Sequence, residues 1–216
     1  MPIRVLLADD HAVLRDGLRS LLESEVDIAV VGDAANGRLA VQQAQQLAPD
    51  VVVMDIAMPE LNGIDAARQI REVSPSTRVV ILSMYSTAEH IRHALQAGAQ
   101  GYLLKESAGT EVVDAVRAVH AGRRYLSQKI IETMIGDYAL HGPASPIEDP
   151  LARLSARERE ILQLVAEGKT SAQIAKILHL SSHSIATYRS RLMRKLGVGD
   201  VAGLVKFAIQ HGLTPE

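Results

Sequence analysis

Four apolar stretches of the chain each end in polar residues of types that can bind a metal ion or contact a phosphate group. These residues are Asp9 and Asp10, Asp55, Ser83, and Lys105. Three neighbouring carboxylates repel one another unless a cation lies among them, and an all-oxygen set with few protein ligands suits Mg²⁺. Lys105 and Ser83 would then contact the oxygens of an anion. The chemistry that follows is capture of a phosphoryl group by Asp55 acting as the nucleophile.

The elements that must position these residues are short strands that alternate with amphipathic helices up to residue 121. Apolar runs cover residues 3–8, 28–34, 51–55, 78–83 and 101–105, with helical spacing of apolar residues between them. This alternation predicts right-handed crossovers and a five-stranded parallel sheet covered on both faces. Ligands of such doubly wound sheets bind outside the carboxyl ends of the strands. The fold would therefore bring the polar residues together in one binding site at this edge of the sheet.

The pattern changes after the last predicted strand. One more helix is expected over residues 127–140, and the segment 141–150 reads as a flexible linker because it holds three Pro and one Gly. Only helices are predicted beyond it. Their start signals are capping boxes at Ser155 with Glu158 and at Thr170 with Gln173, a serine pair at 181–182, and Asp200. Two domains are therefore expected.

The net charge of −2 hides an uneven distribution. Residues 1–125 carry a net charge of −4, residues 126–152 carry −3, and residues 153–216 carry +5. A basic C-terminal part joined to an acidic body favours contact with a polyanion. The chain has no cysteine for a disulfide or thiolate site. It also lacks an apolar run long enough to span a membrane and a signal-peptide pattern, so we expect a soluble cytoplasmic protein that makes no membrane contact.

The segments ADDH (8–11), MDIAMPELNG (54–63), ILSMYS (81–86) and GYLLKE (101–106) resemble the receiver domain of bacterial two-component response regulators. The resemblance spans residues 3–121 and implies a flavodoxin-like sheet of strand order 2-1-3-4-5. It implies that Asp55 is the phosphoacceptor, with Lys105 and Ser83 contacting the phosphoryl group and Tyr102 as the switch aromatic. It also implies Mg²⁺ held by Asp10 directly, Asp9 through water, Asp55 and the backbone carbonyl of Ala57. Many receivers have Pro after the lysine, whereas this chain has Glu106.

The stretch LSAREREILQLVAEGKTSAQIAKILHLSSHSIATYRSRLMRKLGV (154–198) is similar to the helix-turn-helix of the LuxR/NarL type. A receiver followed by this small four-helix unit resembles the NarL/FixJ family of response regulators. Helical periodicity turns Ile185, Tyr188, Leu192 and Leu196 to one face, which must pack inward. The opposite face is the candidate DNA reader.

Basic side chains on that unit would contact the DNA backbone, while small polar ones would meet base edges. The expected phosphate contacts are Lys169, Arg189, Arg191, Arg194 and Lys195. The resemblance implies that Ala186, Thr187 and Ser190 lie where recognition helices of this family meet bases, with His183 near the start of the helix.

These residues predict a receiver at 1–125, a linker helix and flexible linker at 126–150, and a DNA-binding domain at 151–216. The function expected from the resemblance is a transcription regulator, not an enzyme, whose dimerisation and DNA binding are controlled when a sensor histidine kinase phosphorylates Asp55. The partners expected are a homodimer on promoter inverted repeats and, as a further candidate, RNA polymerase. Two alternatives stay open: a regulator that works without phosphorylation, and a Mg²⁺-dependent aspartyl-phosphate phosphatase. The phosphatase would need a second acid at position 57, where this chain has Ala57.

Overall fold

The computed structural model describes residues 1–142, 150–151 and 153–214, and the chain divides into two compact units between residues 144 and 145. Most of the flexible linker predicted at 141–150 lies outside the described residues. No helix in the described ranges is long and apolar enough to cross a membrane.

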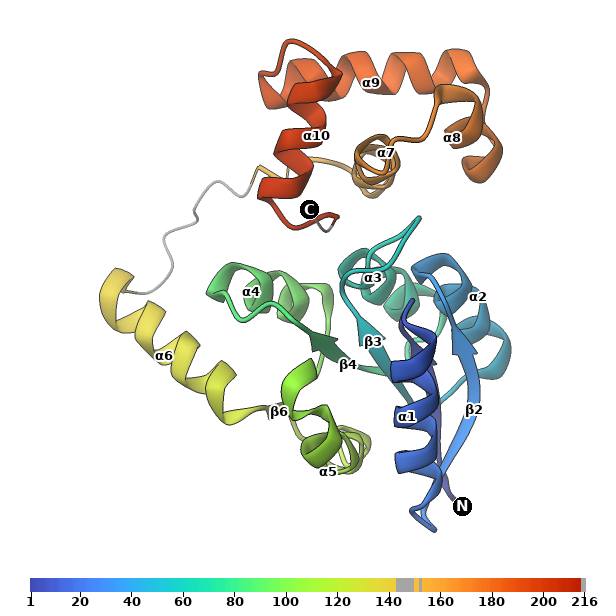
Figure 1. Ribbon diagram of the computed structural model, residues 1–216, viewed down its shortest axis with the longest axis vertical. Coiled ribbons are helices and arrows are strands. Elements are labelled where there is room, and N and C mark those ends of the chain that lie inside the picture. The colour runs from blue at the N-terminus through green and yellow to red at the C-terminus, as the bar shows by residue number, and fades with distance from the viewer. Residues whose placement is uncertain (143–149, 152, 215–216) are drawn as a thin grey trace. The chain divides into compact units, whose positions relative to one another are not determined.

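The first unit is built on a parallel sheet of order β2-β1-β3-β4-β5-β6 (Figure 1). The strands are β1 (Ile3–Ala8), β2 (Ile28–Ala34), β3 (Val51–Asp55), β4 (Arg78–Ser83), β5 (Gly101–Leu104) and β6 (Tyr125–Leu126). Every residue of β3 is buried, as expected for a central strand with helices on both sides. The predicted order of the first five strands is confirmed.

Helices cover both faces of this sheet. They are α1 (Ala12–Glu23), α2 (Gly37–Leu47), α3 (Gly63–Val73), α4 (Ala88–Ala97) and α5 (Ala108–His120), with a 3-10 turn η1 (Lys105–Ser107) before α5. Leu18 and Leu22 of α1 pack with the valines of α5 in one core, while α2, α3 and α4 pack in the other. The doubly wound fold class is therefore confirmed.

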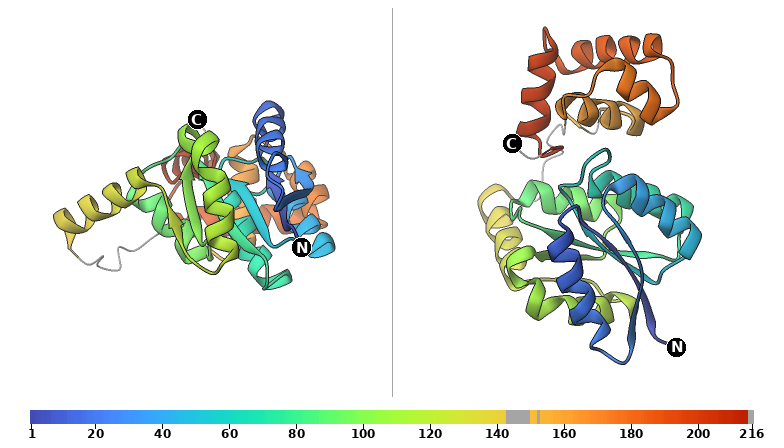
Figure 2. Two further views of the ribbon diagram at one scale, coloured as in Figure 1. Left: turned by 90° about the horizontal axis from the view of Figure 1, so that it is seen from below. Right: turned by 45° about the vertical axis from the view of Figure 1, so that its right-hand side comes forward.

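The sheet has one strand more than the sequence predicts. β6 is two residues long and pairs in parallel with β5, joining Gly101 to Tyr125 and Tyr102 to Leu126. Two residues are too few to produce an alternating pattern, so periodicity cannot reveal such a strand. α6 (Gln128–His141) follows at once and buries Ile130 in the core beside α4, while the helix extends away from the sheet (Figure 2).

In its described residues, the second unit has four helices around a small apolar core. They are α7 (Ala156–Ala166), α8 (Ser171–Leu178), α9 (Ser182–Leu196) and α10 (Val201–Gln210). Both predicted capping boxes are present, with Ser155 opening α7 and Thr170 opening α8. The Asp200 side chain accepts from the Gly203 amide and caps α10. The helical part of the predicted fold is therefore confirmed.

Candidate functional site

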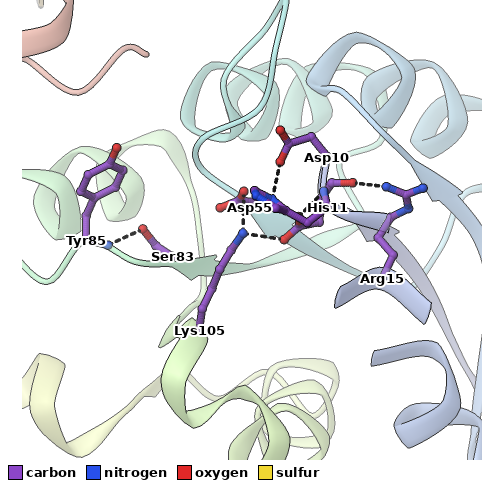
Figure 3. A network of polar contacts seen from close by, with 8 residues as sticks. Asp10, His11, Arg15, Asp55, Ser83, Tyr85 and Lys105 are labelled. Carbon is purple, nitrogen blue, oxygen red and sulfur yellow. Dashed lines mark hydrogen bonds and ion pairs between the residues drawn. The ribbon is translucent and has the colours of Figure 1, made fainter. Parts of the chain in front are cut away.

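The ends of β1, β3, β4 and β5 bring the predicted acidic residues, Ser83 and Lys105 to one edge of the sheet (Figure 3). Asp9 and Asp55 are each only 2% exposed, and Ser83 is fully buried. The Asp9 backbone carbonyl accepts a hydrogen bond from Arg15 at 2.6 Å. Asp55 ends β3 and Asp9 directly follows β1, so the sheet positions both of these carboxylates, while Asp10 lies one residue further on and is exposed.

Lys105 is the cation at the centre of this site. Its Nζ lies 2.8 Å from Asp55 Oδ2, to which it donates a hydrogen bond, and 2.8 Å from Asp9 Oδ2 in an ion pair. Burial by itself would lower the pKa of Lys105, but the contacts with Asp55 and Asp9 outweigh it and raise that pKa. Lys105 is therefore a permanent positive charge at the edge of the sheet.

Asp55 lies in an environment that disfavours its charge. Burial raises the pKa of the Asp55 carboxyl, and the nearby Asp9 charge adds to the rise. Hydrogen bonds from Lys105 and from the Ala57 backbone lower it without cancelling the effect of burial. The site thus holds more negative charge than one lysine neutralises.

The donor set around Asp55 fits a divalent cation. Ligand atoms of Asp9, Asp10, His11 and Asp55 all lie within 4.8 Å of one another. Three ionised carboxylates and the Lys105 ammonium carry a formal charge of about −2 together, which one divalent ion would balance. Asp9 Oδ2 is buried at the same point and faces Lys105 Nζ at 2.8 Å, so the buried Asp9 carboxylate already lies against a cation. Mg²⁺ suits such an oxygen-rich set.

His11 is a member of this cluster that the residue pattern did not single out. Its Nδ1 lies 2.8 Å from Asp10 Oδ1 and 3.1 Å from Asp9 Oδ1, and its backbone amide donates to Asp9 Oδ1 at 2.8 Å. The signal available in the sequence is its position directly after the acidic pair.

Ser83 and Tyr102 are joined through the backbone of Tyr85. The Tyr85 amide donates to Ser83 Oγ at 3.0 Å, and the Tyr102 hydroxyl donates to the Tyr85 carbonyl at 2.7 Å. Tyr102 is fully buried, and burial raises its pKa to about 12. The Tyr85 ring stacks on His90 of α4 with centroids 4.5 Å apart. The segment after β4 is therefore linked to Ser83, to β5 and to α4 together.

Two glycines allow the loops around Asp55 to come close. A Cβ atom at Gly63 would lie 1.9 Å from the Asp55 backbone oxygen, and one at Gly37 would lie 2.0 Å from the Leu61 backbone oxygen. Asn62 caps α3 by accepting from the Asp65 amide at 2.9 Å. The Gly63 close approach brings the start of α3 against the end of β3, so any side chain there would displace the strand end that carries Asp55.

The candidate DNA reader in the second unit is the exposed face of α9. Ile185 and Leu192 are fully buried, and Tyr188 and Leu196 pack partly against the same core, as the helical periodicity predicts. The predicted DNA-contacting residues that are exposed are His183, Ala186, Thr187, Ser190, Arg191, Arg194 and Lys195, while Lys169 and Arg189 are half-buried.

Two of those basic residues have contacts inside the unit. Lys195 Nζ lies 2.7 Å from Glu158 Oε2, and the Glu158 side chain is only 5% exposed and belongs to the capping box of α7. Arg189 donates to Ser171 Oγ at 3.0 Å and so joins α9 to α8. These contacts depend on how three helices pack, which helical periodicity within one helix does not indicate.

Comparisons with known proteins agree with this architecture. Residues 5–117 match the response regulator receiver domain, and residues 152–208 match the bacterial regulatory proteins of the luxR family. The chain is 38% identical to the transcriptional regulatory protein MctR of Rhizobium johnstonii over 214 residues, which are 99% of this chain and 96% of that protein.

Solved structures give the same result. The RcsB response regulator of Salmonella typhimurium superposes with a TM-score of 0.60 at 27% identity, over 95% of this chain and 97% of that one. A structure of an RcsB–DNA complex superposes with a TM-score of 0.59 at 27% identity, over 96% and 98% of the two chains. The protein belongs to the two-component response regulators that join a receiver domain to a LuxR-type helix-turn-helix, and it is a DNA-binding transcription regulator of that family.

Proposed function

We propose that Asp55 is the phosphoacceptor of this response regulator and that its phosphorylation by a sensor histidine kinase controls DNA binding. The observation that carries the proposal is the contact of Lys105 with both Asp55 and Asp9 at the carboxyl edge of the sheet. A nucleophilic carboxylate, a fixed cation and a buried hydroxyl at Ser83 are the groups that phosphoryl transfer requires.

The transfer step follows from these groups. An Asp55 carboxylate oxygen attacks the phosphorus of a phosphohistidine, the phosphorus–nitrogen bond breaks, and a phosphorus–oxygen bond to Asp55 forms. The leaving imidazole of the kinase takes up a proton. Lys105 pairs with the negative charge that arrives, and the Ser83 hydroxyl is placed to donate to a phosphoryl oxygen.

Asp10, Asp9 and Asp55 would hold Mg²⁺, together with the Ala57 carbonyl. When bound, the ion neutralises charge on the transferring group. Asp9 is buried and paired with Lys105, whereas the Asp10 side chain is 35% exposed. This difference supports unequal roles, with Asp10 as the more accessible ligand.

The change at Asp55 would reach α4 through the segment after β4. When the Ser83 hydroxyl turns toward a phosphoryl oxygen, its hydrogen bond with the Tyr85 amide is lost. Tyr85 is stacked on His90 of α4, so a shift of Tyr85 moves or releases that helix. We propose that the altered surface favours a homodimer whose two α9 helices read the two halves of an inverted repeat. The RcsB–DNA complex supports this use of a related unit.

The test uses the full chain with acetyl phosphate and Mg²⁺. Intact mass spectrometry should show one added phosphoryl group in the wild type and in the Asp114→Asn control, which changes an exposed carboxyl on α5. Asp55→Asn should show none. Analytical ultracentrifugation and genome-wide selection of bound DNA are then compared with and without the phosphodonor. The oligomeric state and the set of bound DNA sequences should change for the wild type and stay the same for Asp55→Asn.

Three results would overturn the proposal. Equal phosphoryl uptake by Asp55→Asn would place the acceptor elsewhere. Unchanged oligomeric state and DNA affinity on phosphorylation would favour the alternative of a regulator that works without phosphate. Release of phosphate from added phosphate esters with multiple turnovers would favour the phosphatase, although Ala57 stands where that enzyme needs an acid.

A further inference from the structure

We propose that the His11 imidazole is an additional ligand at the acidic cation site and makes the site prefer divalent transition-metal ions such as Mn²⁺ over Mg²⁺. The inference rests on the proposed cation site of Asp9, Asp10 and Asp55 and deepens it by naming the class of ion that this chain selects.

The position of His11 suits a ligand. Its Nδ1 lies 2.8 Å from Asp10 Oδ1 and 3.1 Å from Asp9 Oδ1 (Figure 3). In an octahedral site with bonds of about 2.1 Å, neighbouring ligand atoms are about 3.0 Å apart and opposite ones about 4.2 Å. The observed separations are close to the neighbour spacing, and the whole set, with Asp55, lies within 4.8 Å. One ion can therefore contact these atoms after small side-chain shifts, with the Nδ1 proton that faces the carboxylates moving to Nε2 or to solvent.

The side chain of His11 is available for this role. It is 66% exposed, so it gives up little packing when the ring turns toward an ion. His11 is the N-cap residue of α1, yet its side chain makes no capping hydrogen bond. Its backbone is held in place because the His11 amide donates to Asp9 Oδ1 at 2.8 Å. The His11 backbone is thus anchored beside the carboxylates, and its exposed ring, which contacts Asp10 and Asp9 through Nδ1, can exchange those contacts for a bond to an ion.

The chemistry of an added nitrogen ligand changes which ion is preferred. Carboxylate and water ligands suit Mg²⁺ and Mn²⁺, whereas imidazole adds affinity mainly for transition metals. Mg²⁺ gains little from a nitrogen donor, since it prefers oxygen ligands. In the described part of the chain, no other set of three or more acidic and histidine residues comes together in this way. The effect should therefore be confined to this site.

The first experiment measures metal affinity directly, without any phosphodonor. Isothermal titration calorimetry gives the dissociation constants for Mg²⁺ and for Mn²⁺ with the wild-type chain, His11→Ala, His11→Asn and His120→Ala. His120 is an exposed histidine on α5 and serves as the matched control. We expect both His11 variants to weaken Mn²⁺ binding by about tenfold or more, as loss of even an outer partner of a metal ligand does. Mg²⁺ binding should change less than threefold, and His120→Ala should match the wild type.

The second experiment detects the nitrogen ligand itself. Electron spin echo envelope modulation of bound Mn²⁺ should show coupling to ¹⁴N in the wild type and in His120→Ala. That coupling should vanish in both His11 variants while Mn²⁺ remains bound through the carboxylates. His11→Asn keeps a polar residue at the N-cap, so circular dichroism of that variant separates ligand loss from any effect on α1.

Three outcomes would overturn the proposal. The first is absence of ¹⁴N coupling in the wild type, and the second is an unchanged ratio of the two dissociation constants in the His11 variants. The third is persistence of ¹⁴N coupling in Asp10→Ala at the Mn²⁺ affinity of the wild type, which would place the ion elsewhere. Because no phosphoryl group is involved, these results are separate from failure of phosphorylation at Asp55.

Discussion

The two units of this protein arrange their functional side chains in opposite ways. In the receiver, Asp9, Asp55 and Ser83 are buried and are brought to one point by strand ends that lie far apart in sequence. In the second unit, the candidate DNA-contacting residues are mostly exposed along a single helix, α9. The first arrangement fixes a reaction centre, whereas the second presents a surface that a long polyanion can follow.

The difference also concerns what the charges do. Lys105 is surrounded by acidic groups of the proposed reaction, so its ion pairs are part of the site. Lys195 is paired with Glu158, a buried residue of the α7 cap, so part of its charge serves the fold of the unit. Counting basic residues therefore overstates the number that are free to meet DNA.

The largest expected effect tests how tightly the receiver site is built. Gly63→Ala would place a methyl group 1.9 Å from the Asp55 backbone oxygen. We expect it to destabilise the receiver by about 3 kcal/mol or more, or to prevent its folding. Gly109→Ala on α5 is the control, because a Cβ atom there meets nothing within 4 Å. It should leave stability unchanged or raise it by up to about 1 kcal/mol. Urea unfolding followed by circular dichroism distinguishes the two, and equal stability would show that the strand end adjusts freely.

The next effect tests the charge at the reaction centre. Lys105→Ala should slow phosphorylation by acetyl phosphate by about 100-fold, because the developing charge loses its fixed cation. Lys129→Ala is the control, since Lys129 is exposed and pairs with Glu106 on the surface. It should change the rate less than twofold. Time courses by intact mass spectrometry give both rates, and a wild-type rate in Lys105→Ala would remove the lysine from the mechanism.

A neighbouring pair on α9 separates DNA contact from folding. Arg194→Ala should weaken DNA binding by about tenfold and reduce the dependence of log K on log salt by about one, with no change in thermal stability. Lys195→Ala should lower the stability of the second unit by about 1 kcal/mol, because Glu158 loses its partner while Lys195 is partly exposed. Fluorescence anisotropy across salt concentrations and thermal unfolding provide the measurements. The distinction fails if both variants lose DNA affinity and neither loses stability.

The smallest effect is a pH dependence of the second unit. Burial by itself would raise the pKa of Glu158, but hydrogen bonds from Lys195 and Ser155 outweigh it and lower that pKa below 4.5. A lowered pKa in the folded state stabilises the unit above pH 4.5, and this contribution is lost as the pH falls through the folded-state pKa. Glu158→Gln should therefore flatten the fall in stability below about pH 4.5. Thermal unfolding of the wild type and of Glu158→Gln, measured between about pH 3 and pH 7 in steps of about one pH unit, tests this. Parallel curves of stability against pH would contradict it.

Much of the fold could be predicted because its elements leave strong local signals. The apolar runs at 3–8, 28–34, 51–55 and 78–83 match the observed strands residue for residue. The run at 101–105 ends one residue early, where Lys105 begins the turn η1. The capping boxes at Ser155 and Thr170 could also be predicted from the sequence, since each consists of two residues at a fixed spacing. β6 leaves no local sequence signal, because its two residues form a strand only through their backbone pairing with β5.

The convergence of Asp9, Asp55 and Lys105 could be predicted because parallel strands share one carboxyl edge. Their functional roles stay predictions. The contacts of His11, the burial of Tyr102 and the pairing of Lys195 with Glu158 depend on side-chain packing between elements. Sequence spacing carries no information about which rotamer meets which neighbour, so these features required the structure.

The short strand β6 has a consequence for handling the receiver by itself. An edge strand presents unpaired backbone groups that can recruit another molecule, and proteins protect such edges with short strands or a covering helix. β6 pairs with β5, and α6 buries Ile130 beside it, so both shield this edge. A receiver fragment ending before Tyr125 would leave the β5 edge open and is expected to aggregate, whereas one that ends after α6 keeps the edge closed.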